Sequence, residues 1–301
     1  MSETSIFKAQ EIFPKTYQIS YTWAIPGTGA DHVFCYLLEG DRYAVLIDTM
    51  YGYGNIRRYV ETLTDKPIKV VNTHFHLDHI GGNFDWDTCY LHWQDIPAFN
   101  ESIRNYAGVE AAYKRCMDSC REECRELFCI EDFPPYRPML VEPLEDGDIF
   151  DLGGKELEVI HVGGHSKGCI ALLDRTNRAL FTGDCVNSNT LLGGRDKENK
   201  VSVQEYMENL LHLETFRDAF DITYGGHQVL PPRVVEDGIA LCGKVLAGTD
   251  AKTVYNVLGM DMVYAEKRGN ETGIPANGSV FNMSYTPDLI YTPKNRKHII
   301  R

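Results

Sequence analysis

The sequence predicts a single α/β domain in which groups of strands are covered by helices on their outer sides. Short apolar strands alternate with amphipathic helices in both halves of the chain, and no low-complexity linker or short repeat separates the halves. The composition agrees, since 43% hydrophobic and 24% charged residues lie in the usual globular range. We therefore expect residues 1–301 to form one sandwich-like domain.

The first half begins with a predicted hairpin. Apolar residues at 33–38 and 43–47 flank a turn-like stretch, which is a typical hairpin pattern. Residues 56–63 place apolar side chains at i, i+3, i+4 and i+7, which predicts an amphipathic helix, and Pro67 ends that segment. A short strand at 68–71 follows and leads directly into a histidine-rich stretch.

The second half repeats the alternation. Strands are predicted at residues 156–162, 169–173 and 178–182. A helix follows, because Ser202 and Glu205 form a capping box ahead of an apolar face. A brief strand at 222–224 and a second amphipathic helix at 235–246, which ends before Gly248, complete the pattern.

Two segments look additional to this core. Residues 95–138 are expected to form a helical insertion that is rich in cysteine and ends in prolines. Its cysteines are Cys116, Cys120, Cys124 and Cys129. The first three recur every fourth residue, so one helix would line them up on one face; we interpret them as buried packing residues, with a second metal or cluster site as the alternative. Residues 250–301 are polar and are expected to form an extended tail, to which the sequence assigns no role.

Charge and targeting signals limit the partners and the compartment. The chain has 30 Lys and Arg against 43 Asp and Glu, a formal charge of −13, which argues against nucleic acid as a partner. No stretch approaches the roughly 18 apolar residues that span a membrane, and the first residues do not resemble a signal peptide. Nine cysteines, an odd number, fit reduced thiols better than disulfides. We expect a cytoplasmic protein that acts on a small molecule and does not bind a membrane.

The strongest functional signal is a cluster of four ligand-type residues directly after a predicted strand. These residues are His74, His76, Asp78 and His79. In an extended segment His74 and His76 point the same way, so both imidazoles can reach one metal ion. Two glycines then let the chain turn, which directs Asp78 and His79 toward a second ion beside the first.

Further ligands are expected at other strand ends. His165, Asp184 and His227 each lie next to glycine at a predicted strand-to-loop junction. Glycine permits a tight turn there, so that a side chain can project into a cleft. A metal ion that activates water for hydrolysis needs about three protein ligands and an open position. The sequence therefore predicts a hydrolytic metal centre that is assembled from several strand ends.

These residues resemble the metallo-β-lactamase superfamily, whose H-x-H-x-D-H motif is matched by residues 74–79 and whose later motifs match in order. The resemblance spans about residues 17–248. It implies a four-layer αβ/βα sandwich with a dinuclear metal site at one edge of the two sheets. It also implies that the first metal is held by His74, His76 and His165, the second by Asp78, His79 and His227, and both by Asp184.

The donor set suits zinc, because imidazole nitrogens and carboxylate oxygens bind zinc at low coordination number. The expected cofactors are two Zn²⁺ ions, with iron or manganese as alternatives. Two cations that share a water lower its pKa toward neutrality, so a hydroxide nucleophile is available to attack a carbonyl carbon. By the resemblance, Asp78 also steers this nucleophile and passes on its proton, and Asp48 orients a ligand from behind.

The expected function is metal-dependent hydrolysis of a small carbonyl compound, which is a lactone, a thioester, an ester or an amide. β-Lactam hydrolysis is not expected, because β-lactamases of this superfamily generally lack the bridging aspartate that Asp184 supplies. The alternatives are a di-iron protein that reduces oxygen or nitric oxide, a phosphodiesterase or nuclease, and a metal-dependent binding module without turnover. His76 stands where the di-iron proteins carry glutamate, and the net charge argues against a nuclease. A homodimer through the insertion is a further interpretation.

Overall fold

A computed structural model describes residues 5–23, 33–105, 108–193, 197–257, 259–269, 275 and 277–292. The strands are β1 (Phe7–Phe13), β2 (Thr16–Tyr21), β3 (Phe34–Glu39), β4 (Ala44–Ile47), β5 (Ile68–Val71), β6 (Thr88–His92), β7 (Leu140–Leu144), β8 (Ile149–Asp151), β9 (Glu156–His161), β10 (Ile170–Asp174), β11 (Ala179–Gly183), β12 (Thr190–Leu191), β13 (Ile222–Gly225), β14 (Val229–Leu230), β15 (Thr253–Val257), β16 (Met260–Tyr264) and β17 (Met283–Tyr285). The α-helices are α1 (Ile56–Val60), α2 (Leu77–Ile80), α3 (Ile96–Asn105), α4 (Val109–Ser119), α5 (Val203–Glu214) and α6 (Val234–Ala247).

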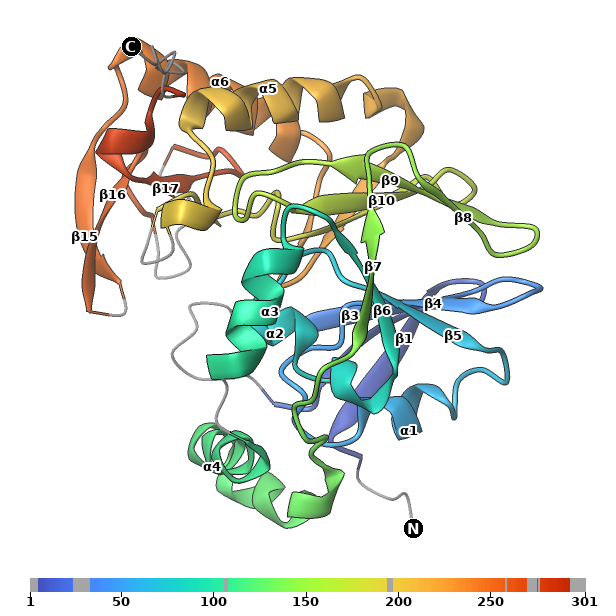
Figure 1. The fold of residues 1–301 in the computed structure, drawn as a ribbon. Coiled ribbons are helices and arrows are strands. Elements are labelled where there is room, and N and C mark those ends of the chain that lie inside the picture. The colour runs from blue at the N-terminus through green and yellow to red at the C-terminus, as the bar shows by residue number, and fades with distance from the viewer. Residues whose placement is uncertain are drawn as a thin grey trace, which may run out of the picture.

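Two sheets stack face to face at the centre of the molecule (Figure 1). The first has seven strands in the order β1 to β7, antiparallel up to β4 and parallel from β4 to β7. The second has the order β14-β13-β11-β10-β9-β8, in which β11 and β13 run parallel and the other neighbours antiparallel. Helices cover the outer face of each sheet, which confirms the predicted four-layer αβ/βα sandwich.

The central strands are buried on both faces, because their side chains alternate between two apolar cores. In β4, Ala44 and Leu46 belong to the core between the first sheet and its helices. Val45 and Ile47 belong to the core between the two sheets. Each of the larger side chains contributes roughly 1.5–3 kcal/mol when it leaves water, so the apolar sequence of the strand specifies a layer on each side.

Helices α5 and α6 cover the second sheet (Figure 1). Helix α5 begins where predicted, since the Ser202 hydroxyl accepts a hydrogen bond of 3.0 Å from the backbone N–H of Glu205. Helix α6 ends at Gly248, whose φ of 71° is the left-handed conformation that glycine adopts readily. Local sequence signals therefore set the start of α5 and the end of α6.

The inserted segment consists of α3, α4 and short 3-10 turns, and it packs on the outer side of the first sheet. The predicted stripe of three cysteines on one helix is wrong, because α4 ends at Ser119 and the backbone of Cys120 is already extended. Cys116 and Cys120 are buried, Cys124 is partly buried and Cys129 is exposed. Among the described residues no cysteine belongs to a group that could hold a metal, so we interpret the buried thiols as packing residues.

The C-terminal segment, which the sequence analysis expected to be an extended tail, contributes strands β15, β16 and β17 to a third sheet. The fourth strand of that sheet is β12, which pairs in parallel with β17 so that Leu191 lies opposite Ser284. Tyr264 and Phe281 are fully buried. The described part of the segment therefore packs onto the sandwich, and residues 293–301 lie outside the described residues.

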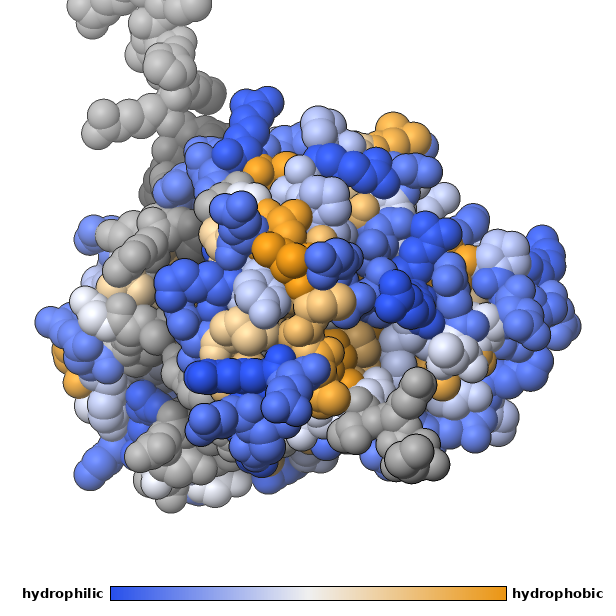
Figure 2. Space-filling view, turned by 90° about the horizontal axis from the view of Figure 1, so that it is seen from below, coloured by the Kyte–Doolittle hydropathy of each residue, from blue (hydrophilic) through white to orange (hydrophobic). Residues whose placement is uncertain are grey.

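Figure 2 views the molecule from below the orientation of Figure 1, the side on which α4 lies. Hydrophilic residues cover most of this face, and apolar residues gather in a band near its centre. Within the ranges that the structure describes, no helix has the length and apolar character needed to cross a bilayer. The homodimer through the insertion stays a prediction.

A pair of histidines joins the two central sheets. His92 ends β6 and His161 ends β9, and their rings stack with centroids 4.3 Å apart and an angle of 7° between the planes. Nε2 of His161 lies 2.7 Å from the carbonyl oxygen of Lys167. Burial, together with the neighbouring His161, lowers the pKa of His92 to about 4. His92 is therefore uncharged at neutral pH.

We expect His92 to make the fold sensitive to acid. A histidine in the unfolded chain has a pKa near 6.5, so between about pH 6.5 and pH 4 the unfolded state binds more protons and stability falls as the pH falls. Between pH 7 and pH 5, wild type should lose about 2 kcal/mol more unfolding free energy than His92→Phe, which keeps an aromatic ring at this position. Urea unfolding of both proteins at the two pH values measures the difference, and equal losses would contradict the prediction.

Candidate metal centre

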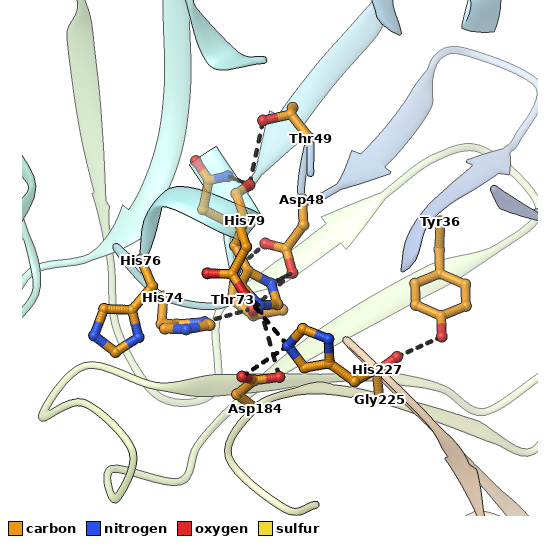
Figure 3. Close-up of polar contacts among 12 residues, drawn as sticks. Tyr36, Asp48, Thr49, Thr73, His74, His76, His79, Asp184, Gly225 and His227 are labelled. Carbon is orange, nitrogen blue, oxygen red and sulfur yellow. Dashed lines mark hydrogen bonds and ion pairs between the residues drawn. The ribbon is translucent and has the colours of Figure 1, made fainter. Parts of the chain in front are cut away.

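Five loops bring polar side chains to one edge of the two sheets. The loops after β4 and β5 in the first sheet carry Asp48 and residues 73–79. The loops after β9, β11 and β13 in the second sheet carry His165, Asp184 and His227. Figure 3 shows several of these side chains pointing toward one another from separate elements. The structure thus brings together all seven residues that the sequence analysis singled out as ligands.

The first group of donors consists of His74, His76 and His165, whose ligand atoms all lie within 4.8 Å of one another. Nδ1 of His76 is 2.8 Å from Nε2 of His165. The ring of His74 is edge-on to both, with centroids 4.7 Å from His76 and 5.1 Å from His165. The segment that carries His74 is a bend and not the extended strand that the sequence suggested. The bend nevertheless aims both of its imidazoles at His165.

The second group consists of Asp78, His79, Asp184 and His227. Asp78 and His79 lie in the one-turn helix α2, for which His76 is the N-cap residue. Nε2 of His227 lies 3.3 Å from Oδ2 of Asp78 and 3.2 Å from Oδ2 of Asp184. Nε2 of His79 lies 3.6 Å from a carboxylate oxygen of each aspartate. Two carboxylates and two imidazoles therefore converge.

Asp184 lies between the two groups. Its Oδ2 is 3.7 Å from Nε2 of His165 in the first group, and its Oδ1 is 3.6 Å from Nε2 of His79 in the second. Asp184 directly follows β11, and 6% of its surface is exposed. This position suits a ligand that is shared by both groups.

Three buried atoms at the centre have no hydrogen-bond partner among the described residues: Nε2 of His74, Nε2 of His79 and Oδ1 of Asp184. A buried polar atom without a partner costs roughly 1–3 kcal/mol. Metal ions would satisfy all three, because imidazole nitrogen and carboxylate oxygen are common ligands of divalent cations. The residues present therefore fit a centre of two metal ions.

The two groups differ in protonation. Burial lowers the pKa of His74 and of His165 well below the usual value, so both rings are neutral and keep a lone pair for a metal. Burial also disfavours a charged His227, but the carboxylates of Asp184 and Asp78 outweigh it and raise the pKa of His227 to about 10. In the metal-free protein a proton on His227 balances these carboxylates, and a bound metal has to displace that proton.

Asp48 holds His79 from behind. Its Oδ2 lies 2.8 Å from Nδ1 of His79, which leaves Nε2 free to face the centre. The backbone N–H and the hydroxyl of Thr73 each donate to the same carboxylate at 2.8 Å. The Thr73 hydroxyl also lies 3.2 Å from Nδ1 of His74. Asp48 therefore lies behind a ligand, as the resemblance implied. Thr73, which the sequence analysis missed, connects the carboxylate of Asp48 to His74 in the first group.

The third sheet supports His165. Nδ1 of His165 lies 3.1 Å from the carbonyl oxygen of Leu191 in β12, the strand that pairs with β17. The Nζ of Lys200 donates to the backbone carbonyl of His165. Neither contact has a signal in the sequence, because each joins residues that are far apart in the chain. The C-terminal segment, which had no assigned role, thus helps to orient a predicted ligand.

A tyrosine and a glycine shape the loop of His227. The buried hydroxyl of Tyr36 donates to the carbonyl oxygen of Gly225 at 2.6 Å (Figure 3). A Cβ at Gly226 would lie 2.4 Å from Cε1 of His79 and 2.8 Å from Oδ1 of Asp184. Position 226 therefore requires glycine, because the backbone passes directly against two of the ligand side chains.

Comparison with known proteins agrees with this geometry. The family model of the metallo-beta-lactamase superfamily matches residues 28–227, which is more than half of the chain and includes all seven candidate ligands. The chain belongs to the metallo-β-lactamase superfamily. A solved metallo-beta-lactamase from Pontibacter korlensis is 16% identical, with a TM-score of 0.56 over 78% of this chain and 97% of that chain. A metallo-beta-lactamase family protein from Thermus thermophilus is 22% identical, with a TM-score of 0.52 over 79% of this chain and 82% of that chain. At these sequence identities the two solved structures show that the fold is shared, and nothing about activity follows from them.

Several curated relatives of this superfamily member are named as hydrolases, and two of the three that follow are named as thioesterases. The human acyl-coenzyme A thioesterase MBLAC2 is 28% identical over 52% of this chain and 59% of its own length. A probable hydroxyacylglutathione hydrolase from Schizosaccharomyces pombe is 23% identical over 71% of this chain and 70% of its own length. An atrochrysone carboxyl ACP thioesterase from Aspergillus fumigatus is 25% identical over 64% of this chain and 49% of its own length. This chain thus spans less than two thirds of the human protein.

Proposed function

We propose that this chain is a metal-dependent hydrolase of small thioesters that uses two zinc ions. The observation that carries this proposal is the convergence of two donor groups on Asp184, around three buried atoms that lack partners in the described structure. The similarity to proteins named as thioesterases supports the substrate class. Iron and manganese are the alternative metals, because they accept the same nitrogen and oxygen donors.

The bound metals would supply a water molecule that is acidified toward neutral pH and a Lewis acid for the thioester carbonyl. The first metal would be held by His74, His76 and His165, the second by Asp78, His79 and His227, and both by Asp184. The lowered pKa values of His74 and His165 support these roles, because a neutral imidazole binds a metal without first losing a proton.

We assign proton transfer to Asp78 in addition to its ligand role. The side chain of Asp78 is 22% exposed, against 8% for Asp184, so it is the more accessible carboxylate of the second group. Burial opposes ionisation of Asp78, but His79 and His227 outweigh it and lower its pKa, so Asp78 is ionised at neutral pH, as a metal ligand must be. A thiol has a pKa near 8.5, so the thiolate leaves with little assistance from an acid.

A substrate panel tests the proposal. The zinc-loaded protein is given acyl-coenzyme A, S-acylglutathione, lactone and nitrophenyl phosphodiester substrates. A chromogenic thiol reagent follows the thioesters, a pH indicator follows acid release from the lactones, and nitrophenolate absorbance follows the phosphodiesters. We expect kcat/KM for one thioester class to exceed the values for the lactones and the phosphodiesters by at least about 100-fold. Faster turnover of a lactone or a phosphodiester would replace the proposed substrate class, and two bound irons without any hydrolysis would favour a redox protein.

We also propose a cytoplasmic location and a small-molecule substrate without nucleic acid. All nine cysteines are free, which agrees with a reducing compartment. The net charge of −13 disfavours nucleic acid, because phosphate backbones are bound by clustered cations. Both points agree with an enzyme that acts on a soluble metabolite-sized thioester.

A further inference from the structure

We propose that Asp95 is a positioning residue that locks the loop of His165 against the loop that carries His74 and His76; this inference rests on the proposed metal centre. Asp95 directly precedes α3 at the start of the inserted segment, and it is 1% exposed. It belongs to neither donor group. A buried carboxylate is tolerated only where hydrogen bonds compensate it, so its partners indicate what it holds together.

The first partners of Asp95 lie in the loop of His165. Oδ2 of Asp95 accepts a hydrogen bond of 2.5 Å from the hydroxyl of Ser166, and Oδ1 accepts one of 2.7 Å from the backbone N–H of Gly168. Ser166 directly follows His165 in the chain. A Cβ at Gly168 would lie only 2.7 Å from Cγ of Asp95, so glycine is what allows this close approach. One carboxylate therefore holds the loop immediately beyond the ligand.

The histidine-rich loop lies beside the loop that Asp95 holds, since Nδ1 of His76 is 2.8 Å from Nε2 of His165. Burial raises the pKa of Asp95, and the hydrogen bonds from Ser166 and Gly168, the nearby His76 and the backbone of Phe75 all act against that rise. Phe75 stands between His74 and His76 in the chain. Asp95 thus holds the His165 loop by hydrogen bonds at the place where the two loops of the first donor group, which come from different sheets, approach each other at His76 and His165.

The turn that contains Asp95 also contacts the residue that precedes the His165 loop. The backbone N–H of Asp95 donates to the carbonyl oxygen of His92 at 2.9 Å. His92 stacks on His161, which precedes the loop, while Asp95 binds residues 166 and 168, which follow the ligand. The ligand His165 therefore lies between two segments, one before it and one after it, that contact residues 92–95. The sequence analysis missed Asp95, because nothing in a lone aspartate before a helix indicates a partner 71 residues away.

Asp237 provides a matched control, because it makes the same kind of contacts outside the donor groups. Its Oδ2 accepts hydrogen bonds from the Ser279 hydroxyl at 3.0 Å and from the backbone N–H of Val280 at 2.9 Å. If Asp95 had a purely structural role, the variants Asp95→Asn and Asp237→Asn would both lose stability and neither would change metal binding.

The test measures metal binding without catalysis. Metal-free wild type, Asp95→Asn and Asp237→Asn are titrated with zinc in competition with a chromophoric chelator, and with cobalt(II), whose visible absorption reports its coordination geometry. Thermal unfolding of the three metal-free proteins records the structural cost. We expect Asp95→Asn to weaken one of the two zinc sites by about 10- to 100-fold and to change the cobalt spectrum, while Asp237→Asn binds both ions like wild type.

Wild-type zinc affinity at both sites in a folded Asp95→Asn protein would overturn the inference. If that variant does not fold, Ser166→Ala removes one hydroxyl and leaves the carboxylate in place; it should weaken one site by about 2- to 10-fold, and unchanged affinity would likewise overturn the inference. A wild-type protein that binds fewer than two zinc ions would instead disprove the proposed metal centre and, with it, this role for Asp95.

Discussion

The variant Asp184→Asn is expected to bind one zinc ion tightly instead of two and to lose at least about 100-fold in kcat. Residues that merely orient a metal ligand change affinity or activity by about 10- to 100-fold, and Asp184 reaches both donor groups itself, so this figure is a lower bound. Asparagine keeps the shape of the side chain but removes its charge and one acceptor oxygen. Both oxygens matter here, because Oδ1 faces His79 and Oδ2 faces His165 and His227.

Metal content by inductively coupled plasma mass spectrometry and steady-state kinetics on the best thioester measure these effects. Asp174→Asn is the control, since Asp174 is buried too and binds the backbone N–H and the side chain of Asn177 outside the centre. This control should lose stability and keep both metals. Two zinc ions with unchanged turnover in Asp184→Asn would mean that Asp184 does not bridge the two groups.

The metal centre could be predicted because four of its seven candidate ligands lie close together in the sequence. His74, His76, Asp78 and His79 lie within six residues, so a ligand pattern is visible before any fold is known. The strands that lead into the ligand loops were also predictable, because β4, β5 and β11 are apolar runs bounded by turn residues. Their order along the chain and the glycines at their ends then indicated which further histidines and aspartates would join the cluster.

The residues behind the ligands could not be anticipated in the same way. Asp95 contacts the loop of His165, and the carbonyl oxygen of Leu191 contacts its ring, only because distant elements lie together in the fold. Pairing between distant strands and loops leaves no periodic trace in the sequence. The pairing of β12 with β17 was missed for the same reason, since the two strands lie more than ninety residues apart. The four-residue spacing of the cysteines predicted a continuous helix, whereas α4 ends at Ser119 and the backbone of Cys120 is extended.

The variant Asp48→Asn is expected to weaken zinc binding in the second donor group by about 10- to 100-fold. The carboxylate of Asp48 lies 2.8 Å from Nδ1 of His79, and a negative acceptor there makes Nε2 a better donor to a metal. Asparagine can keep one acceptor for the backbone N–H of Thr73, but it has no charge with which to polarise the His79 ring. The loss should therefore appear in metal affinity more than in the stability of the metal-free protein.

Backbone conformation allows this electrostatic effect to be separated from strain. Asp48 has a φ of +61°, in the left-handed region, which asparagine tolerates well and alanine does not. Asp48→Ala should therefore lose the same metal affinity as Asp48→Asn and, in addition, about 1–2 kcal/mol of unfolding free energy. Chelator competition and urea unfolding on both metal-free variants measure the two quantities separately. If Asp48→Asn bound two zinc ions with wild-type affinity while Asp48→Ala was merely unstable, Asp48 would shape the turn after β4 and would not tune His79.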